Sequence, residues 1–134
     1  MAKDPSKRKS KLMSTNDHAV PPDDISPLDF FSRWVPEMVA RDQRRQKKLG
    51  NTQARIVFVF DEPEYGAYTI YVNSGEVRGE AGRVADPDLE IQIGFETWRS
   101  LNRGEISAPE AALRRRLKLT GDTVLALKLH LILG

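Results

Sequence analysis

The eleven residues before the C-terminal glycine constrain the fold more than any other part of this sequence. Residues 123–133 carry eight apolar side chains. At 100° per residue these occupy nearly the whole circumference of a helix, except a strip near Thr123 and His130. Because such a helix cannot face water, we expect it to be buried in a core or a dimer interface, or to line an apolar cavity with one face. At eleven residues it is too short to span a bilayer.

Five stretches upstream predict a β-sheet. Residues 55–60 are β-branched and aromatic with apolar groups on both faces, which is typical of a central strand covered on both sides. The short turn at residues 73–75 predicts a hairpin between its two neighbours. Period-two alternation or β-branched enrichment predicts the remaining strands over residues 67–73, 76–81, 89–93 and 117–120.

Helical spacing and capping residues predict helices around these strands. Ser26 followed by Pro27 begins the first helix, which Pro36 is expected to kink or divide. A polar run over residues 41–48 ends at Gly50. Residues 95–101 then form a short helix, Ser107 caps another, and Asp122 caps the closing helix.

The length of 134 residues predicts one domain. Residues 1–27 hold few large apolar side chains, so we expect a disordered tail, with the folded domain over residues 28–134. The N-terminus has lysines but no apolar stretch after them, so a secretory signal is missing and we expect a cytoplasmic protein. The absence of cysteine excludes disulfides and thiolate chemistry.

No group of residues predicts catalysis, a metal or a cofactor. The carboxylates of residues 62–64 and 86–88 flank prolines and have no His or Lys partner at acid/base or metal-ligand spacing, so we interpret them as loop solvation. The basic runs at residues 44–48 and 114–116 could contact phosphate or a membrane surface. The first has no interleaved aromatic residue for base stacking, so we expect no nucleic-acid partner.

The second half of the chain resembles the sterol carrier protein type two family. The resemblance rests on the order of four groups: Phe95-Glu96-x-Trp98-x-x-Leu101, Arg103-Gly104-Glu105-Ile106, Ser107-x-Pro109-x-Ala111, and Leu117-Lys118-Leu119-Thr120-Gly121-Asp122 followed by Ala126-Leu127-Lys128-Leu129. It extends more weakly back to Phe30. The chain departs from the family pattern at Glu105, where a basic residue is usual, and at Arg115, where glycine is common.

The resemblance implies an α/β fold of the α+β type: a five-stranded, mainly antiparallel sheet covered by helices, with an apolar cavity between sheet and helices. It implies a domain over residues 28–134 that binds and transfers an apolar lipid (fatty acyl, acyl-CoA, sterol or isoprenoid) without catalysis. A membrane surface or an enzyme would be a transient partner. The alternative is an interaction or dimerisation module that uses the closing helix without a ligand, and the oligomeric state stays open. The implied lining residues are Phe95, Trp98, Leu101, Ile106, Ala111, Leu113, Leu125, Leu129 and Ile132.

Overall fold

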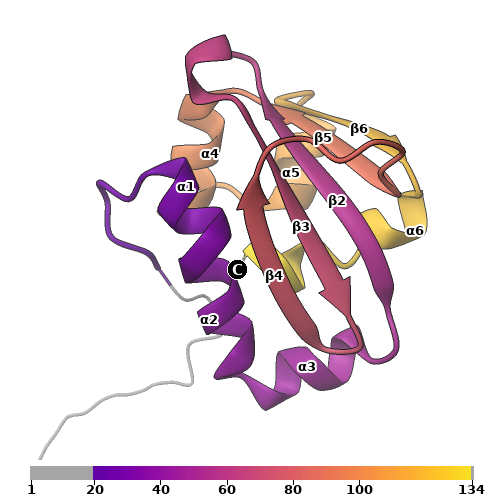
Figure 1. Cartoon of the computed structure of the whole chain (residues 1–134). Helices are drawn as coiled ribbons and strands as arrows, with labels where there is room; N and C mark the ends of the chain where they lie inside the picture. Colours follow the sequence, from indigo (N-terminus) through magenta and orange to yellow (C-terminus); the bar gives the residue numbers. More distant parts are fainter. Residues whose placement is uncertain (1–19, 134) are drawn as a thin grey trace, which may run out of the picture.

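A five-stranded sheet forms the centre of the fold in the computed structural model, which describes residues 20–133 (Figure 1). Its strands are β2 (Gln53–Phe60), β3 (Ala67–Asn73), β4 (Glu76–Ala81), β5 (Leu89–Ile93) and β6 (Leu117–Gly121). They lie in the order β4-β3-β2-β5-β6. β2 pairs antiparallel with β3 and parallel with β5, and the two remaining pairs are antiparallel. The mainly antiparallel sheet and the central position of residues 55–60 are therefore confirmed.

The two faces of the sheet have different surroundings. On the inner face Ile56 pairs with Ile70 of β3 and with Leu89 of β5, and all three side chains are buried. The helices lie on this side, whereas the outer face turns toward the reader (Figure 1). Residues two apart along a strand share a face, so the inner-facing apolar side chains of the five strands form one continuous surface.

The loop between β4 and β5 crosses the outer face, because β4 is an edge strand and β5 lies beyond β3 and β2 (Figure 1). Thr69 Oγ1 donates to the carbonyl of Gly82 at 2.8 Å and accepts from the amide of Val84 at 3.2 Å. Arg55 Nη2 donates to the carbonyl of Asp86 at 2.6 Å. This crossing explains why Val57, which alternation places on the outer face, is fully buried, and why β2 is apolar on both sides.

The N-terminal helix runs through α1 (Pro27–Asp29), the π-helical turn η1 (Phe30–Trp34) and α2 (Val35–Ala40). The Ser26 hydroxyl accepts from the amide of Asp29, which confirms the predicted cap. The interruption expected at Pro36 appears as the π-turn immediately before it. That wider turn gives the proline ring room that a regular turn denies it, because the ring clashes with the carbonyl four residues earlier.

Two short elements complete the first half. The helix α3 (Gln43–Leu49) is capped by the Asp42 carboxylate, which accepts from two backbone amides, and ends at Gly50 with a φ of 55°. This is the predicted end of the polar run. A single 3-10 turn, η2 (Pro63–Tyr65), joins β2 to β3.

The second half adds α4 (Phe95–Asn102) and α5 (Ala108–Leu113) before β6, then α6 (Thr123–Ala126) and α7 (His130–Leu133). The predicted caps are confirmed, since Ser107 accepts from the amide of Glu110 and Asp122 from those of Val124 and Leu125. The prediction of one continuous closing helix is wrong. After Ala126 the α-helical bonding gives way to bonds between residues three apart, and a second short helix begins at His130.

Candidate functional site

The expected lining residues come together as part of one hydrophobic cluster, with one exception. Phe95 is half-buried at the edge of that cluster, and the fully packed members have between 0% and 7% of their surface exposed. The packed members are Trp98, Leu101, Ile106, Ala111, Leu125, Leu129 and Ile132. They lie under the inner face of the sheet and are close-packed, so the structure shows them as core.

Leu113 is the exception, because 85% of its side chain surface is exposed. It is the last residue of α5, whose buried face is carried by Ala111. Two residues further along a helix correspond to a rotation of about 200°, so Leu113 lies on the opposite side from Ala111. The structure does not bring Leu113 together with the other lining residues.

The closing segment, defined as residues 123–133, is held mainly by bonds between residues three apart. The amides of Leu127, Lys128 and Leu129 donate to the carbonyls of Val124, Leu125 and Ala126 at 2.9–3.2 Å. Such 3-10 bonds have poorer geometry than α-helical bonds. The side chains divide between two environments: Leu125, Leu129, Leu131 and Ile132 are buried, whereas Val124 and Leu127 are 67% and 76% exposed.

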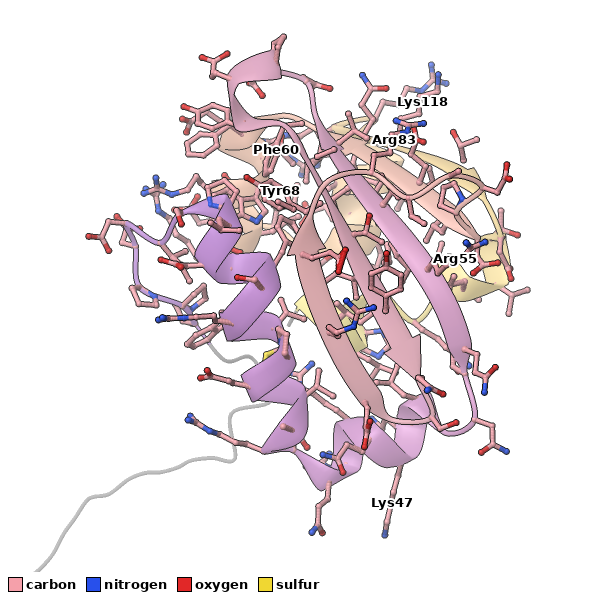
Figure 2. The ribbon with its side chains drawn as sticks, viewed as in Figure 1. Lys47, Arg55, Phe60, Tyr68, Arg83 and Lys118 are labelled. Atoms are coloured by element: carbon pink, nitrogen blue, oxygen red, sulfur yellow. The ribbon has the colours of Figure 1, made fainter. Side chains whose placement is uncertain are left out.

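Aromatic rings fill the space between η1, β2 and α4. The Trp98 ring lies nearly perpendicular to the rings of Phe30 and Phe60, at centroid distances of 5.4 and 5.5 Å. Tyr68 stacks on Phe31 at 5.1 Å, and burial raises the pKa of the Tyr68 hydroxyl. Figure 2 shows Phe60 and Tyr68 close together at this end of the sheet. The candidate site therefore has an aromatic wall on one side.

Two buried hydrogen-bond donors on α4 have no acceptor among residues 20–133. They are the Trp98 indole Nε1 and the Asn102 Nδ2, on side chains that are 1% and 6% exposed. The apolar pattern of the sequence predicts Trp98 as a site residue but not Asn102. The signal that could have found it is the spacing of four residues, which places both side chains on one face of a helix.

A carboxylate that no sequence pattern predicts, Asp23, contacts α4 through two arginines. Arg103 Nε donates to Asp23 Oδ1 at 2.7 Å, and Arg99 Nη2 lies 3.3 Å from Asp23 Oδ2. The hydrogen bond from Arg103, with the positive charges of both arginines, holds the pKa of Asp23 below its ordinary value. The same contact raises the pKa of Arg103. The segment before α1 is thereby tied to α4.

A separate hollow of about 560 Å³ opens on β2, β3 and β4. Two of its charged side chains have contacts within the chain: the Arg78 guanidinium lies 4.1 Å above the Tyr71 ring, and the Asp88 carboxylate accepts from the amide of Arg55 at 2.8 Å. Arg55, Arg83 and Lys118 mark the outer side of the sheet in Figure 2. None of the expected lining residues borders this hollow, whose wall mixes apolar side chains with the charged groups of Arg55, Glu76 and Asp88.

Within residues 20–133 no three His, Cys, Asp or Glu side chains gather where they could hold a metal ion. In the same part of the chain no helix combines the length and apolar character needed to cross a membrane.

A family profile matches residues 36–134 and carries the description SCP-2 sterol transfer family. The chain belongs to this family. No curated protein matches the chain in sequence. The resemblance seen in the sequence is thus confirmed over most of the domain.

Solved structures of the SCP-2 family share the fold. The apo form of sterol carrier protein 2 from Yarrowia lipolytica has a TM-score of 0.53 and 20% identity, over 78% of this chain and 81% of that one. Palmitated SCP2L2 from Aedes aegypti has a TM-score of 0.53 and 18% identity, over 77% and 95%. At these identities the likeness shows the fold alone.

The fold also occurs inside a larger enzyme, the sec-alkylsulfatase PisA1 of Pseudomonas sp.. A double mutant of that enzyme has a TM-score of 0.61 and 17% identity, and the match covers 89% of this chain but 17% of the enzyme. This chain therefore spans less than a fifth of the sulfatase. The SCP-2 fold can stand alone or form one part of a longer chain.

Proposed function

We propose that this SCP-2 family chain encloses an apolar lipid between its sheet and its helices, and transfers or presents that lipid without catalysing a reaction. The observation that carries the proposal is the closing segment, which buries Leu125, Leu129 and Ile132 against the cluster yet lacks the continuous bonding of an α-helix. The proposed ligand class is fatty acyl, acyl-CoA, sterol or isoprenoid. The proposed location is the cytoplasm.

The physical advantage of such a carrier is large. An 18-carbon acyl chain has about sixteen methylene groups, and each costs about 0.8 kcal/mol to expose to water. Moving the chain from a membrane into water therefore costs on the order of 13 kcal/mol. An apolar enclosure lowers that barrier without any bond being made or broken, so the carrier requires no catalytic group.

The lipid would enter by displacing the closing segment. Seven of the proposed lining residues are buried in the cluster, so space for a ligand has to be created by moving one of the covering elements. α6 and α7 are the best candidates, since each comprises four residues, and helices shorter than about 12 residues are marginal without tertiary support. Outward rotation of this segment would withdraw Leu129 from the hydrophobic cluster and open it.

A second candidate function is a docking or dimerisation module, favoured by the exposed side chains of Val124 and Leu127. In this alternative the same segment contacts another protein through its outer side and no ligand enters. An enzyme that uses the lipid, or a membrane surface, would be a transient partner in the first proposal. The two functions differ in which side of the closing segment makes the contact.

A pair of substitutions in the closing segment separates these functions. Leu129→Arg places a cation in the buried cluster and should abolish binding of a fluorescent fatty acid or sterol probe. Leu127→Arg is the matched control, because the Leu127 side chain is 76% exposed, and should leave probe binding intact. A native mass spectrum of the freshly purified full chain should show bound lipid in the wild type.

The opposite results would contradict the carrier proposal. Absence of lipid and of probe binding in the wild type, with Leu129→Ala lowering the unfolding free energy by about 2–5 kcal/mol, would assign the closing segment to an ordinary core. If the wild type were also a dimer by light scattering and Leu127→Arg made it a monomer, the interaction module would replace the carrier.

A further inference from the structure

The two unsatisfied donors of α4 are unusual in a core of this kind. Trp98 Nε1 and Asn102 Nδ2 are buried in side chains that are 1% and 6% exposed, and neither has an acceptor among residues 20–133. Leaving a buried donor without a partner is strongly unfavourable, and the great majority of buried polar groups are hydrogen-bonded. Two such donors on one helix therefore require an explanation.

Their spacing allows one small group to satisfy both. Residues four apart on a helix have Cβ atoms about 5–6 Å from each other, and their side chains extend over the same face. Both groups donate through N–H, so their common partner has to be an acceptor. A carbonyl oxygen has two lone pairs and can accept from two donors at once. A hydrocarbon has none.

The charges near α4 argue for a neutral acceptor. Each donor is followed in sequence by an arginine, and Asp23 pairs with both of them. Arg99 Nη2 lies 3.3 Å from Asp23 Oδ2, and Arg103 Nε donates to Asp23 Oδ1 at 2.7 Å. Around Trp98 the described ring neighbours are aromatic, including Phe30 and Phe60. Burying an ionised carboxylate without a counterion is very unfavourable. The donors thus match an oxygen with no net charge.

We propose that Trp98 Nε1 and Asn102 Nδ2 form a polar subsite inside the lipid enclosure, which binds the neutral carbonyl oxygen of a ketone, quinone or ester on an otherwise apolar ligand. This inference rests on the proposed carrier function and makes it more specific. It separates ligands of similar length by their head group: a neutral carbonyl compound binds more tightly than the alkane or the ionised acid.

The test uses three ligands of thirteen carbons, delivered from cyclodextrin to the full chain: 2-tridecanone, tridecane and tridecanoate. The Trp98 indole N–H resonance, identified by its survival in Trp34→Phe, should shift on addition of 2-tridecanone and much less on addition of tridecane. Trp98→Phe and Asn102→Leu should each weaken binding of 2-tridecanone by roughly two- to twelvefold, the range expected for loss of one neutral hydrogen bond. Their affinity for tridecane should change by less than twofold.

Trp34→Phe is also the matched control for affinity, since Trp34 lies in η1 and is only partly buried; its affinity for 2-tridecanone should equal that of the wild type. Asn102→Leu removes an unsatisfied donor with little change of volume, so its melting temperature should not fall. If Trp98→Phe does not fold, Asn102→Leu and the wild-type indole resonance still decide the question.

Each of the other possible results would contradict one specific part of the proposal. 2-Tridecanone and tridecane could bind equally well, with neither substitution changing the affinity. This result would show that the two donors bind only a water molecule, and it would contradict the polar subsite but not the carrier function. Tightest binding of tridecanoate would overturn the neutral head group. Failure of all three ligands and of the fluorescent lipid probe to bind would instead overturn the carrier function itself.

Discussion

At the scale of single residues, Asp23 makes the contact that connects the N-terminal segment to α4. Its carboxylate bridges Arg99 and Arg103, which are four residues apart and so lie on one face of the helix. Ion pairs at a surface contribute little to global stability. The contact should therefore act locally, by fixing the path of residues 20–26 across α4.

The first prediction concerns the pH dependence of this contact. The pKa of Asp23 is lowered, first by the hydrogen bond from Arg103, so the folded protein holds the carboxylate ionised below the ordinary pKa of about 3.9. The contribution is fully present above that ordinary value and is lost as the pH falls through the depressed folded-state pKa. An NMR titration of the Asp23 carboxyl carbon should give a midpoint below the ordinary value.

Arg103→Leu provides the control for that titration. Removing the hydrogen bond and one positive charge should move the Asp23 midpoint upward, toward the ordinary value, while Arg99 still holds it partly down. A wild-type midpoint at or above the ordinary value would show that Asp23 does not pair with α4 in solution.

At the scale of elements, η1 packs very closely on β4. A Cβ on Gly79 would lie 1.8 Å from the carbonyl oxygen of Phe31 and 2.9 Å from the side chain of Ile70. No side chain can occupy that space unless the helix moves off the strand. The glycine thus determines how closely the N-terminal helix packs on the edge of the sheet.

We predict that Gly79→Ala lowers the unfolding free energy by roughly 1–3 kcal/mol or more, as overpacking does when backbone has to shift. Chemical denaturation would measure it. Gly94→Ala is the matched control, because its nearest foreign atom is the Asp61 carboxylate at 3.2 Å, which can rotate away. A Gly79→Ala effect no larger than that of Gly94→Ala would show that η1 and β4 are not in contact.

Local sequence signals predicted the elements better than their pairing. All five strands appear within two residues of their predicted bounds, and Ser26, Ser107 and Asp122 cap helices as expected. These features depend on neighbours along the chain. The parallel pairing of β2 with β5 and the crossing of residues 82–88 over the outer face depend on segments far apart in sequence, which no local pattern specifies.

The closing segment shows why a helical pattern failed. On a straight α-helix Leu131 lies about 120° around the axis from Leu125, so the two side chains cannot both point directly at one sheet. The structure buries both by breaking the helix between them. The candidate site was predicted where burial follows from apolar periodicity, as for Leu129. The prediction omitted Asn102, because a polar residue does not contribute to an apolar pattern. It wrongly included Leu113, which lies on the exposed side of α5, opposite the buried Ala111.

At the scale of the whole molecule, the contacts of the N-terminal segment extend the folded unit beyond the first helix. Pro21 is buried, Ile25 packs against the hydrophobic cluster, and Asp23 pairs with α4. Residues 1–19 lie outside the described residues, so the boundary of the tail at residue 27 stays a prediction. The contacts favour a boundary nearer residue 20.

Two truncations would locate this boundary. Removing residues 1–19 deletes few large apolar side chains, so the melting temperature should stay within a few degrees of the full chain. Removing residues 1–25 also deletes Asp23 and the apolar side chains of Pro21 and Ile25. Burial of these two apolar side chains is worth roughly 1–2 kcal/mol, so the melting temperature should fall by roughly 4–10 °C. The comparison isolates six residues, since both proteins begin with an added methionine. Equal melting temperatures for both truncations would place the boundary at residue 27, whereas a large fall on removal of residues 1–19 alone would show that the N-terminal tail contributes to the fold.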